Sequence, residues 1–298
     1  MTSDLERLID RVERVLARFE ETLPHAKSAP DWKSGLAYRW RRRGNRGFLQ
    51  PVAHPHKIRL TDLQGIDDQI KLIDQNTRQF MEGLTANNVL LTGARGTGKS
   101  SLVKALLNKF SSRGLRLIEV DKQDLMDLSD IVDLIADVPF KFILFCDDLS
   151  FDADEPGYKA LKVILDGSIS APSDNLLIYA TSNRRHLMPE FMQENLETKY
   201  LGEEIHPGES VEEKISLSER FGLWVSFYPF DQDEYLAIVY YWLGELGVPE
   251  RARGTTARSE ALQWALTRGS RSGRVAWHFA RDWAGRHRIS AGSLRKKS

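Results

Sequence analysis

A glycine-rich segment restricts this 298-residue chain more than any other part, and it reads Gly93-Ala94-Arg95-Gly96-Thr97-Gly98-Lys99-Ser100. It fills every fixed position of the pattern G-x-x-x-x-G-K-[ST], in which glycines let backbone N–H groups turn toward a phosphate chain. The lysine supplies a cation to the β and γ phosphates, and the serine hydroxyl ligates Mg²⁺. An apolar run over 88–92 and helical spacing over about 98–110 predict a buried strand before the segment and a helix after it.

The segment therefore predicts binding of a nucleoside triphosphate, with ATP and Mg²⁺ as the expected ligands. The backbone of 93–98 and the side chains of Lys99, Ser100 and Ser101 are the expected phosphate contacts.

The composition is that of an ordinary globular protein, with 41% hydrophobic and 28% charged residues. No apolar run approaches the roughly 18 residues that a membrane span needs, and the first residues carry no signal-peptide core. The single cysteine, Cys146, excludes an internal disulfide and lies in an apolar run that predicts an inert core thiol. These features predict a cytoplasmic protein.

The charge is balanced overall but unevenly spread. Residues 1–60 carry a net charge of +6 and residues 251–298 a net charge of +10, whereas residues 61–250 carry −16. Two basic ends around an acidic centre indicate either self-association or an anionic partner at the ends.

The apolar pattern predicts an α/β fold with a parallel sheet covered by helices on both faces. We expect five strands, near 88–92, 115–120, 141–147, 176–182 and 224–227. We expect helices near 66–81, 99–110, 124–136, 157–168, 187–197, 232–245 and 257–287, and an exposed acidic loop over 202–212. The resulting division is an N-terminal helical and basic extension over 1–57, an α/β nucleotide-binding core over 58–230, and a helical lid with a basic tail over 231–298.

Within the N-terminal extension, residues 3–22 place apolar side chains on one helical face, while 24–60 contain prolines and glycines that predict irregular structure. This irregular part holds arginines interleaved with aromatic residues, namely Arg39, Arg41, Arg42, Arg43 and Arg46. Three interpretations remain open: contact with a nucleic-acid backbone, docking on the acidic middle of a neighbouring subunit, or a solvated loop with its rings on the core.

Polar side chains follow two of the predicted strands. Asp147 and Asp148 end the apolar run 142–146, and Asn183 ends the run 176–182. Carboxyl ends of parallel strands meet at the edge of a sheet where ligands bind. Asp147 is the expected Mg²⁺ ligand together with Ser100, Asp148 the residue that polarises the attacking water, and Asn183 a contact to the γ-phosphate.

Together these motifs resemble an AAA+ ATPase over about residues 58–283. The resemblance implies a three-layer P-loop core with a C-terminal helical lid, and it makes Asn183 the sensor-1 residue. It also implies that Arg220, in 217–222, is an arginine finger acting on a neighbouring subunit, that Arg274, in 269–276, is the sensor-2 residue of the lid, and that 60–66 lines the adenine pocket. More narrowly, 88–101 and 147–151 are similar to an uncharacterised bacterial family of ATP-binding proteins, domain of unknown function 815.

The sequence departs from the AAA+ pattern in two places. Asp148 stands where that superfamily usually has Glu, one methylene longer, which indicates slower water activation and makes Glu155 a substitute candidate for the base. Residues 122–128 also lack the aromatic-hydrophobic-glycine pore loop of relatives that thread proteins.

Three functions compete on these grounds: an ATPase that remodels or loads a macromolecular partner, such as a protein or a nucleic acid; a slowly hydrolysing ATP-gated switch; and a small-molecule kinase. The remodelling or loading ATPase, working as a homo-oligomer, is the primary prediction.

Overall fold

The computed structural model of the chain describes residues 11, 30–44, 46–151, 155–166, 174–183, 199–201, 204–206 and 218–295. The chain divides into two compact units, Met1–Asp31 and Trp32–Ser298. The predicted helices over 3–22 and 187–197 and most of the predicted acidic loop lie outside the described residues. The three-part domain division remains a prediction.

A seven-stranded sheet forms the centre of the second unit, with the strand order β2-β1-β4-β5-β6-β3-β9. Its strands are β1 (Ala37–Arg43), β2 (Arg46–Pro51), β3 (Val89–Gly93), β4 (Leu115–Glu119), β5 (Lys141–Cys146), β6 (Leu176–Ser182) and β9 (Leu223–Phe227). All neighbours in it are parallel except β1 and β2, which form an antiparallel hairpin at one edge. A separate hairpin pairs β7 (Lys199–Leu201) with β8 (Glu204–His206).

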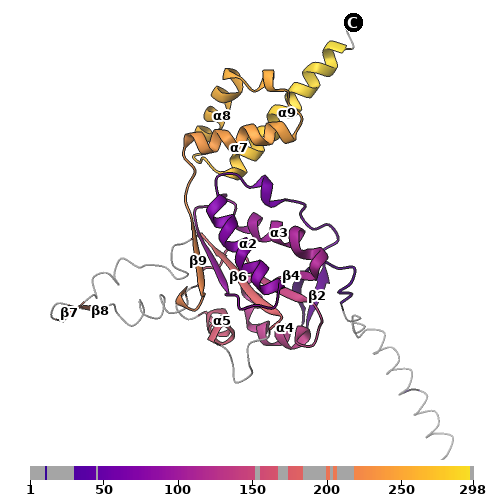
Figure 1. Ribbon diagram of the computed structural model, residues 1–298, viewed down its shortest axis with the longest axis vertical. Helices are drawn as coiled ribbons and strands as arrows, with labels where there is room; N and C mark the ends of the chain where they lie inside the picture. The colour runs from indigo at the N-terminus through magenta and orange to yellow at the C-terminus, as the bar shows by residue number, and fades with distance from the viewer. Residues whose placement is uncertain are drawn as a thin grey trace, which may run out of the picture. The chain divides into compact units, whose positions relative to one another are not determined.

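Helices cover both faces of the sheet, as predicted for a three-layer α/β core (Figure 1). The helices are α2 (Asp67–Met81), α3 (Lys99–Phe110), α4 (Leu128–Ile135), α5 (Pro156–Asp166), α7 (Gln232–Glu245), α8 (Thr255–Thr267) and α9 (Gly273–Arg295). Helices α2 and α3 bury apolar side chains in one core cluster, whereas α4 and α5 bury theirs in a second cluster on the other face. Strands β3, β5 and β6 between these layers are almost entirely buried, which explains their continuous apolar sequences.

The prediction of irregular structure over 24–60 is wrong for the β1–β2 hairpin, and the sheet has seven strands where the sequence predicted five. Along β1, Tyr38 and Trp40 are buried while Arg39 is exposed, which is the alternation of a half-buried strand. The exposed arginines hid that period in the sequence. The hairpin takes residues from before position 58 into the central sheet.

Two predicted helices differ in detail. The segment predicted as a helix over 124–136 begins as a 3₁₀ turn at Lys122–Asp127 before α4. The segment predicted over 257–287 is two helices, because Gly269 takes a left-handed φ of 63° and Ser272 restarts the chain as the cap of α9.

Helices α7, α8 and α9 lie together beyond the end of the sheet and form the lid predicted at the C-terminus (Figure 1). The first of them is anchored by a capping box, in which the side chains of Asp231 and Glu234 each accept the other's backbone N–H at 2.8 Å. Among the described residues, no helix is long and apolar enough to cross a membrane.

Candidate nucleotide site

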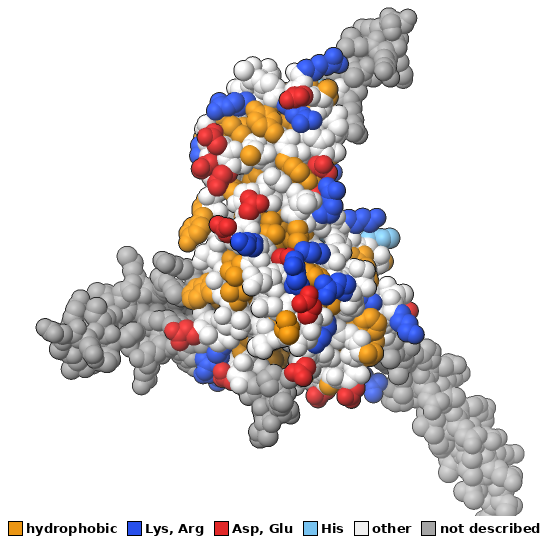
Figure 2. Space-filling model, in the orientation of Figure 1, with side chains coloured by type: hydrophobic (Ala, Val, Ile, Leu, Met, Phe, Trp, Pro, Cys, Tyr) orange, Lys and Arg blue, Asp and Glu red, His pale blue; other side chains and the backbone are white. Residues whose placement is uncertain are grey.

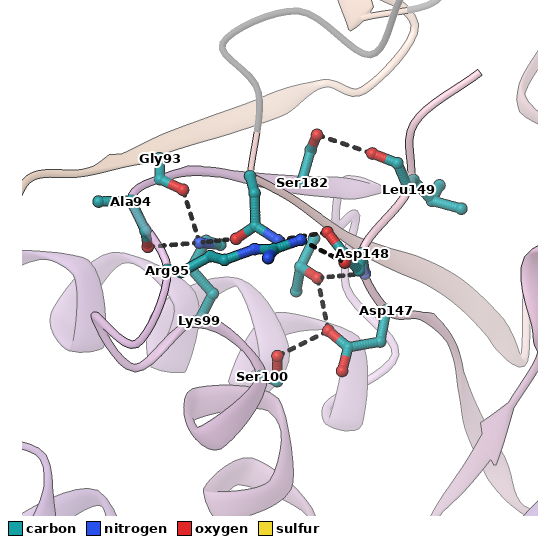
Figure 3. Close-up of polar contacts among 11 residues, drawn as sticks. Gly93, Ala94, Arg95, Lys99, Ser100, Asp147, Asp148, Leu149 and Ser182 are labelled. Carbon is teal, nitrogen blue, oxygen red and sulfur yellow. Dashed lines mark hydrogen bonds and ion pairs between the residues drawn. The ribbon is translucent and has the colours of Figure 1, made fainter. Parts of the chain in front are cut away.

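The phosphate loop joins the end of β3 to the start of α3, so the positive end of that helix faces the loop. Lys99 is buried, and its ammonium donates to the carbonyl oxygens of Gly93 at 2.7 Å and Ala94 at 2.8 Å, and to Asn183 Oδ1 at 3.1 Å (Figure 3). All three N–H bonds of the ammonium therefore have acceptors within the protein.

Burial lowers the pKa of Lys99 from 10.5 to about 8. The carboxylates of Asp147 and Asp148 oppose this shift, whereas the positive charges of Arg95 and Arg274 reinforce it. The loop thus holds a desolvated cation among other cations, a setting that an anionic ligand stabilises.

Asp147 accepts hydrogen bonds from two hydroxyl groups. Its Oδ1 accepts from Ser100 Oγ at 2.6 Å and from Thr181 Oγ1 at 2.6 Å. A hydroxyl and a carboxylate at this distance present the hard oxygen ligands that Mg²⁺ prefers, and Mg²⁺ commonly takes only one or two protein ligands besides water and phosphate. The predicted pair of Ser100 and Asp147 is therefore brought together.

Thr181 is a structural member of the site to which the sequence reasoning gave no role. It is 2% exposed, and its Oγ1 also accepts the backbone N–H of Asp148 at 2.8 Å. The signal that would have found it is a hydroxyl near the end of a strand neighbouring the acidic one, because parallel register aligns such positions.

Asp148 has the one left-handed backbone among the described non-glycine residues, with φ of 55°. Aspartate tolerates this conformation better than most residues. Its Oδ1 accepts from Asn183 Nδ2, and its Oδ2 lies 3.6 Å from Arg95 Nη2. The two predicted catalytic residues Asp148 and Asn183 are thus in direct contact.

The helical lid forms the other wall of the candidate nucleotide site. The backbone N–H of Gly273, at the start of α9, donates to the carbonyl of Gly96 in the phosphate loop at 2.9 Å. Gly96 has φ of 76°, and a Cβ on it would lie 2.8 Å from Ser272 Oγ, so only glycine allows the lid to approach this closely. The next residue, Arg274, lines the same cavity as Lys99.

The cavity between core and lid has a volume of about 860 Å³. Its charged lining residues are the cations Lys57, Arg95, Lys99, Lys104 and Arg274 and the acids Asp62, Asp147 and Asp148. Its apolar lining residues are Ile58, Leu63, Ile66, Phe230, Ile238, Trp242 and Trp277, which include two residues of the stretch 60–66. On the face drawn in Figure 2, Lys and Arg side chains gather around the junction of lid and core.

Arg220 does not line this cavity. It precedes β9, whose first residue Leu223 pairs with Val89 and whose last residue Phe227 pairs with Gly93, so it lies toward the opposite edge of the sheet from the phosphate loop. Its guanidinium forms an ion pair with Asp166 at the end of α5.

Glu155, the substitute candidate for the base, also lies outside the residues that line the cavity and forms an ion pair with Lys122 at 2.7 Å.

Three of the five N-terminal arginines that the sequence singled out have acidic partners in the same chain. Arg39 pairs with Glu119 at 2.6 Å, Arg41 with Asp121, and Arg42 with Asp127 at 3.4 Å. Trp40, between them, donates its indole N–H to Asp127 at 2.8 Å. These contacts tie the hairpin to β4 and to the 3₁₀ turn that follows it.

The three-layer α/β core, the phosphate loop after β3 and the helical lid over that loop define the fold of an AAA+ P-loop ATPase. Within that class the chain belongs to the family described as Protein of unknown function (DUF815), whose family model matches residues 33–287. The resemblance stated from the sequence is thereby confirmed. No match is found among curated proteins.

Solved structures similar to this chain include the Orc1 protein of Aeropyrum pernix in complex with DNA, at 14% identity and a TM-score of 0.51, covering 72% of this chain and 58% of that one. A point mutant of RuvB from Thermotoga maritima follows at 17% identity and a TM-score of 0.48, covering 75% and 64%. The HORMA:CdnC:Trip13 complex of E. coli MS115-1 contains a chain at 12% identity and a TM-score of 0.48, covering 80% and 94%.

This chain spans less than two thirds of the length of the first two. At these identities the likeness concerns the fold.

Proposed function

We propose that this protein is a Mg²⁺-dependent ATPase that couples ATP binding and hydrolysis to the remodelling or loading of a macromolecular partner. The observation that carries the proposal is that Lys99, Ser100 and Asp147 line one cavity together with apolar and aromatic side chains such as Ile66 and Trp277. A triphosphate and a base together require both kinds of lining.

In this proposal, the loop backbone of 93–98 with Lys99 and Ser101 binds the phosphates, and Ser100 and Asp147 hold Mg²⁺. Asp148 orients the attacking water, and Asn183 contacts the γ-phosphate from the neighbouring strand. Arg274 senses the same phosphate from the lid, whose contact with Gly96 couples lid position to the content of the loop.

The closing test is steady-state phosphate release from ATP, measured with Mg²⁺ and with EDTA. Asp148→Asn should lower turnover by about 10²- to 10⁴-fold without weakening ATP binding, because general-base assistance concerns the reaction step. Asn also tolerates the left-handed backbone of this position. Asp133→Asn, an exposed residue of α4, is the matched control. Equal turnover in all three proteins would remove Asp148 from the mechanism.

The second candidate is a switch that binds ATP and hydrolyses it slowly. The observation favouring it is the short Asp148 side chain, whose two oxygens are already engaged by Asn183 and Arg95. Tight ATP binding by the wild-type chain, with no phosphate release above the EDTA control, would select the switch. ADP production that depends on an added metabolite would instead revive the kinase, which no described feature favours.

Assembly is part of the proposal, because Arg220 lies away from its own cavity and fits an arginine finger only for a neighbouring subunit. To act there it must exchange Asp166 for a phosphate. Activity per chain should rise with protein concentration, and mixing inactive Arg220→Ala and Lys99→Ala chains should restore part of it. Activity that is independent of concentration, with no recovery on mixing, would contradict a shared site.

Nucleic acid as the partner has weaker support than the ATP site, because Arg39, Arg41 and Arg42 already pair with carboxylates of their own chain. The Orc1 structure contains DNA, but its likeness to this chain concerns the fold. Cytoplasmic location remains part of the proposal.

A further inference from the structure

Arg95 is the third residue of the phosphate loop, and its side chain is 76% exposed. It extends from the loop across the mouth of the site toward the end of β5, where its Nη2 lies 3.6 Å from Asp148 Oδ2 (Figure 3). Neither the requirements of the loop backbone nor the packing of α3 calls for an arginine at this position, since the fixed positions of the loop pattern lie elsewhere.

Arg95 ends a chain of polar contacts that crosses the space in front of the loop. Lys99 donates to Asn183 Oδ1, Asn183 Nδ2 donates to Asp148 Oδ1, and Asp148 Oδ2 faces Arg95. In this series of contacts, Lys99, Asn183 and Arg95 therefore each face an acceptor that belongs to the protein. The carboxylate of Asp148 has Asn183 at one oxygen and Arg95, at ion-pair distance, at the other.

The contact between Arg95 and Asp148 is easily exchanged. Both side chains are more than half exposed, at 76% and 56%, and solvent screening leaves such ion pairs with little net stabilisation. A phosphate group offers a guanidinium two oxygens in fork geometry and more negative charge than a carboxylate. A triphosphate that extends along the loop toward Asn183 therefore competes successfully for Arg95.

We propose that Arg95 binds the terminal phosphate of the nucleotide within its own chain and, in doing so, releases the Asp148 carboxylate. The inference rests on the proposed ATPase function and adds a regulatory step to it. A triphosphate reaches Arg95 and frees Asp148, whereas a diphosphate leaves the two paired. Arg95 is a positioning residue for Asp148 and a determinant of selectivity for ATP over ADP.

The test compares the affinities of a non-hydrolysable ATP analogue and of ADP by calorimetry. Arg95→Ala should weaken analogue binding by about 10- to 100-fold, the range of one charge-assisted hydrogen-bonded contact, and change ADP affinity by less than about twofold. Arg95→Lys, which keeps the charge but loses the fork, should lie between. Arg78→Ala, an exposed arginine of α2 paired with Asp74 at 2.9 Å, is the matched control and should change neither affinity.

A double-mutant cycle tests the exchange itself. Asp148→Asn should strengthen analogue binding several-fold, because Arg95 no longer has a competing carboxylate, and Arg95→Ala should then lose more affinity in that background than in the wild type. Equal loss for analogue and ADP, or no loss with either, would overturn the role of Arg95 while leaving ATP binding standing. If the wild-type chain binds neither nucleotide, the proposed function fails together with the inference.

Discussion

The sequence predicts that Lys99 in the phosphate loop faces an anion, and it leaves an anionic partner open for Arg41 in strand β1. In the folded chain the two cations have different partners. Lys99 donates to backbone carbonyls and an amide inside a cavity, and no described carboxylate lies within ion-pair distance of it. Arg41 pairs with Asp121, just beyond the neighbouring strand β4.

The difference shows that a cluster of cations in a sequence can indicate either a ligand site or ion pairs within the chain. In the phosphate loop, the spacing of the glycines sets the backbone conformation, and that conformation sets the direction of the cationic side chains. These cations therefore remain directed at a ligand site. In β1, Arg39 and Arg41 alternate with the buried Tyr38 and Trp40, and they pair with Glu119, the last residue of β4, and with Asp121 just beyond it. Their described contacts stabilise the hairpin, and the same residue composition does not by itself indicate an external anion.

The largest effect is expected for Lys99→Ala, which should abolish measurable affinity for a fluorescent ATP analogue. The lowered pKa of Lys99 means that burial disfavours its charge, so removing the charge should not unfold the chain. Circular dichroism and thermal unfolding provide the control. Binding as tight as that of the wild type would show that the loop is not the phosphate site.

On the buried face of β1, in contrast, a substitution is expected to lower the stability of the chain. Trp40 is 3% exposed, and Trp40→Ala should lower the free energy of unfolding by about 3–5 kcal/mol. Chemical denaturation measures the change, and Arg41→Ala, with its exposed ion pair, should cost less than about 1 kcal/mol. A larger cost for Arg41 than for Trp40 would mean that the ion pairs rather than the ring hold the hairpin.

The protonation state of Lys99 should have a smaller effect, on the pH dependence of ATP affinity, and this effect has no counterpart in β1. A bound triphosphate stabilises the ammonium, so the pKa of Lys99 is higher in the complex than the value of about 8 in the free chain. ATP affinity should therefore be constant below pH 8 and fall about tenfold per pH unit above it. Titrations in EDTA avoid competing cations, and Lys99→Arg, which stays charged, should show no such fall.

The smallest effect is expected when Arg41, Arg42 and Arg43 are replaced together by Ala. If the hairpin binds nucleic acid, the triple variant should bind more weakly and with a flatter salt dependence. Because two of these arginines are already paired, we expect little change. A large loss of DNA or RNA binding at about 50 mM salt would reverse the interpretation of β1, and absence of binding by the wild type would end the hypothesis.

Much of the core was predictable because its signals are local. Strands β3, β4, β5, β6 and β9 and helices α2, α3, α5 and α7 lie within a few residues of their predicted bounds. Buried parallel strands have continuous apolar sequences, and amphipathic helices repeat within a few turns. The lid was predicted as a helical region, but its break between α8 and α9 depends on one left-handed glycine and one cap.

The candidate site was predictable where a residue's position in its own strand or loop decides its direction. Asp147 and Ser100 meet as expected, and Asn183 reaches Asp148 from the neighbouring strand. The sequence reasoning gave no role to Thr181 and placed only the backbone of Arg95 at the phosphates, because the side-chain contacts of both depend on residues of other segments.

The sequence by itself determined the phosphate loop, the acidic end of β5 and the positions of the central strands along the chain, since each is encoded in a handful of consecutive residues. Only the tertiary structure decided that the arginine-rich segment is a strand beside β4, that the lid rests on Gly96, and that Asp148 is held between Asn183 and Arg95. The physical reason is that these contacts join segments far apart in the chain, where pairing depends on burial and charge around the folded sheet rather than on any local pattern.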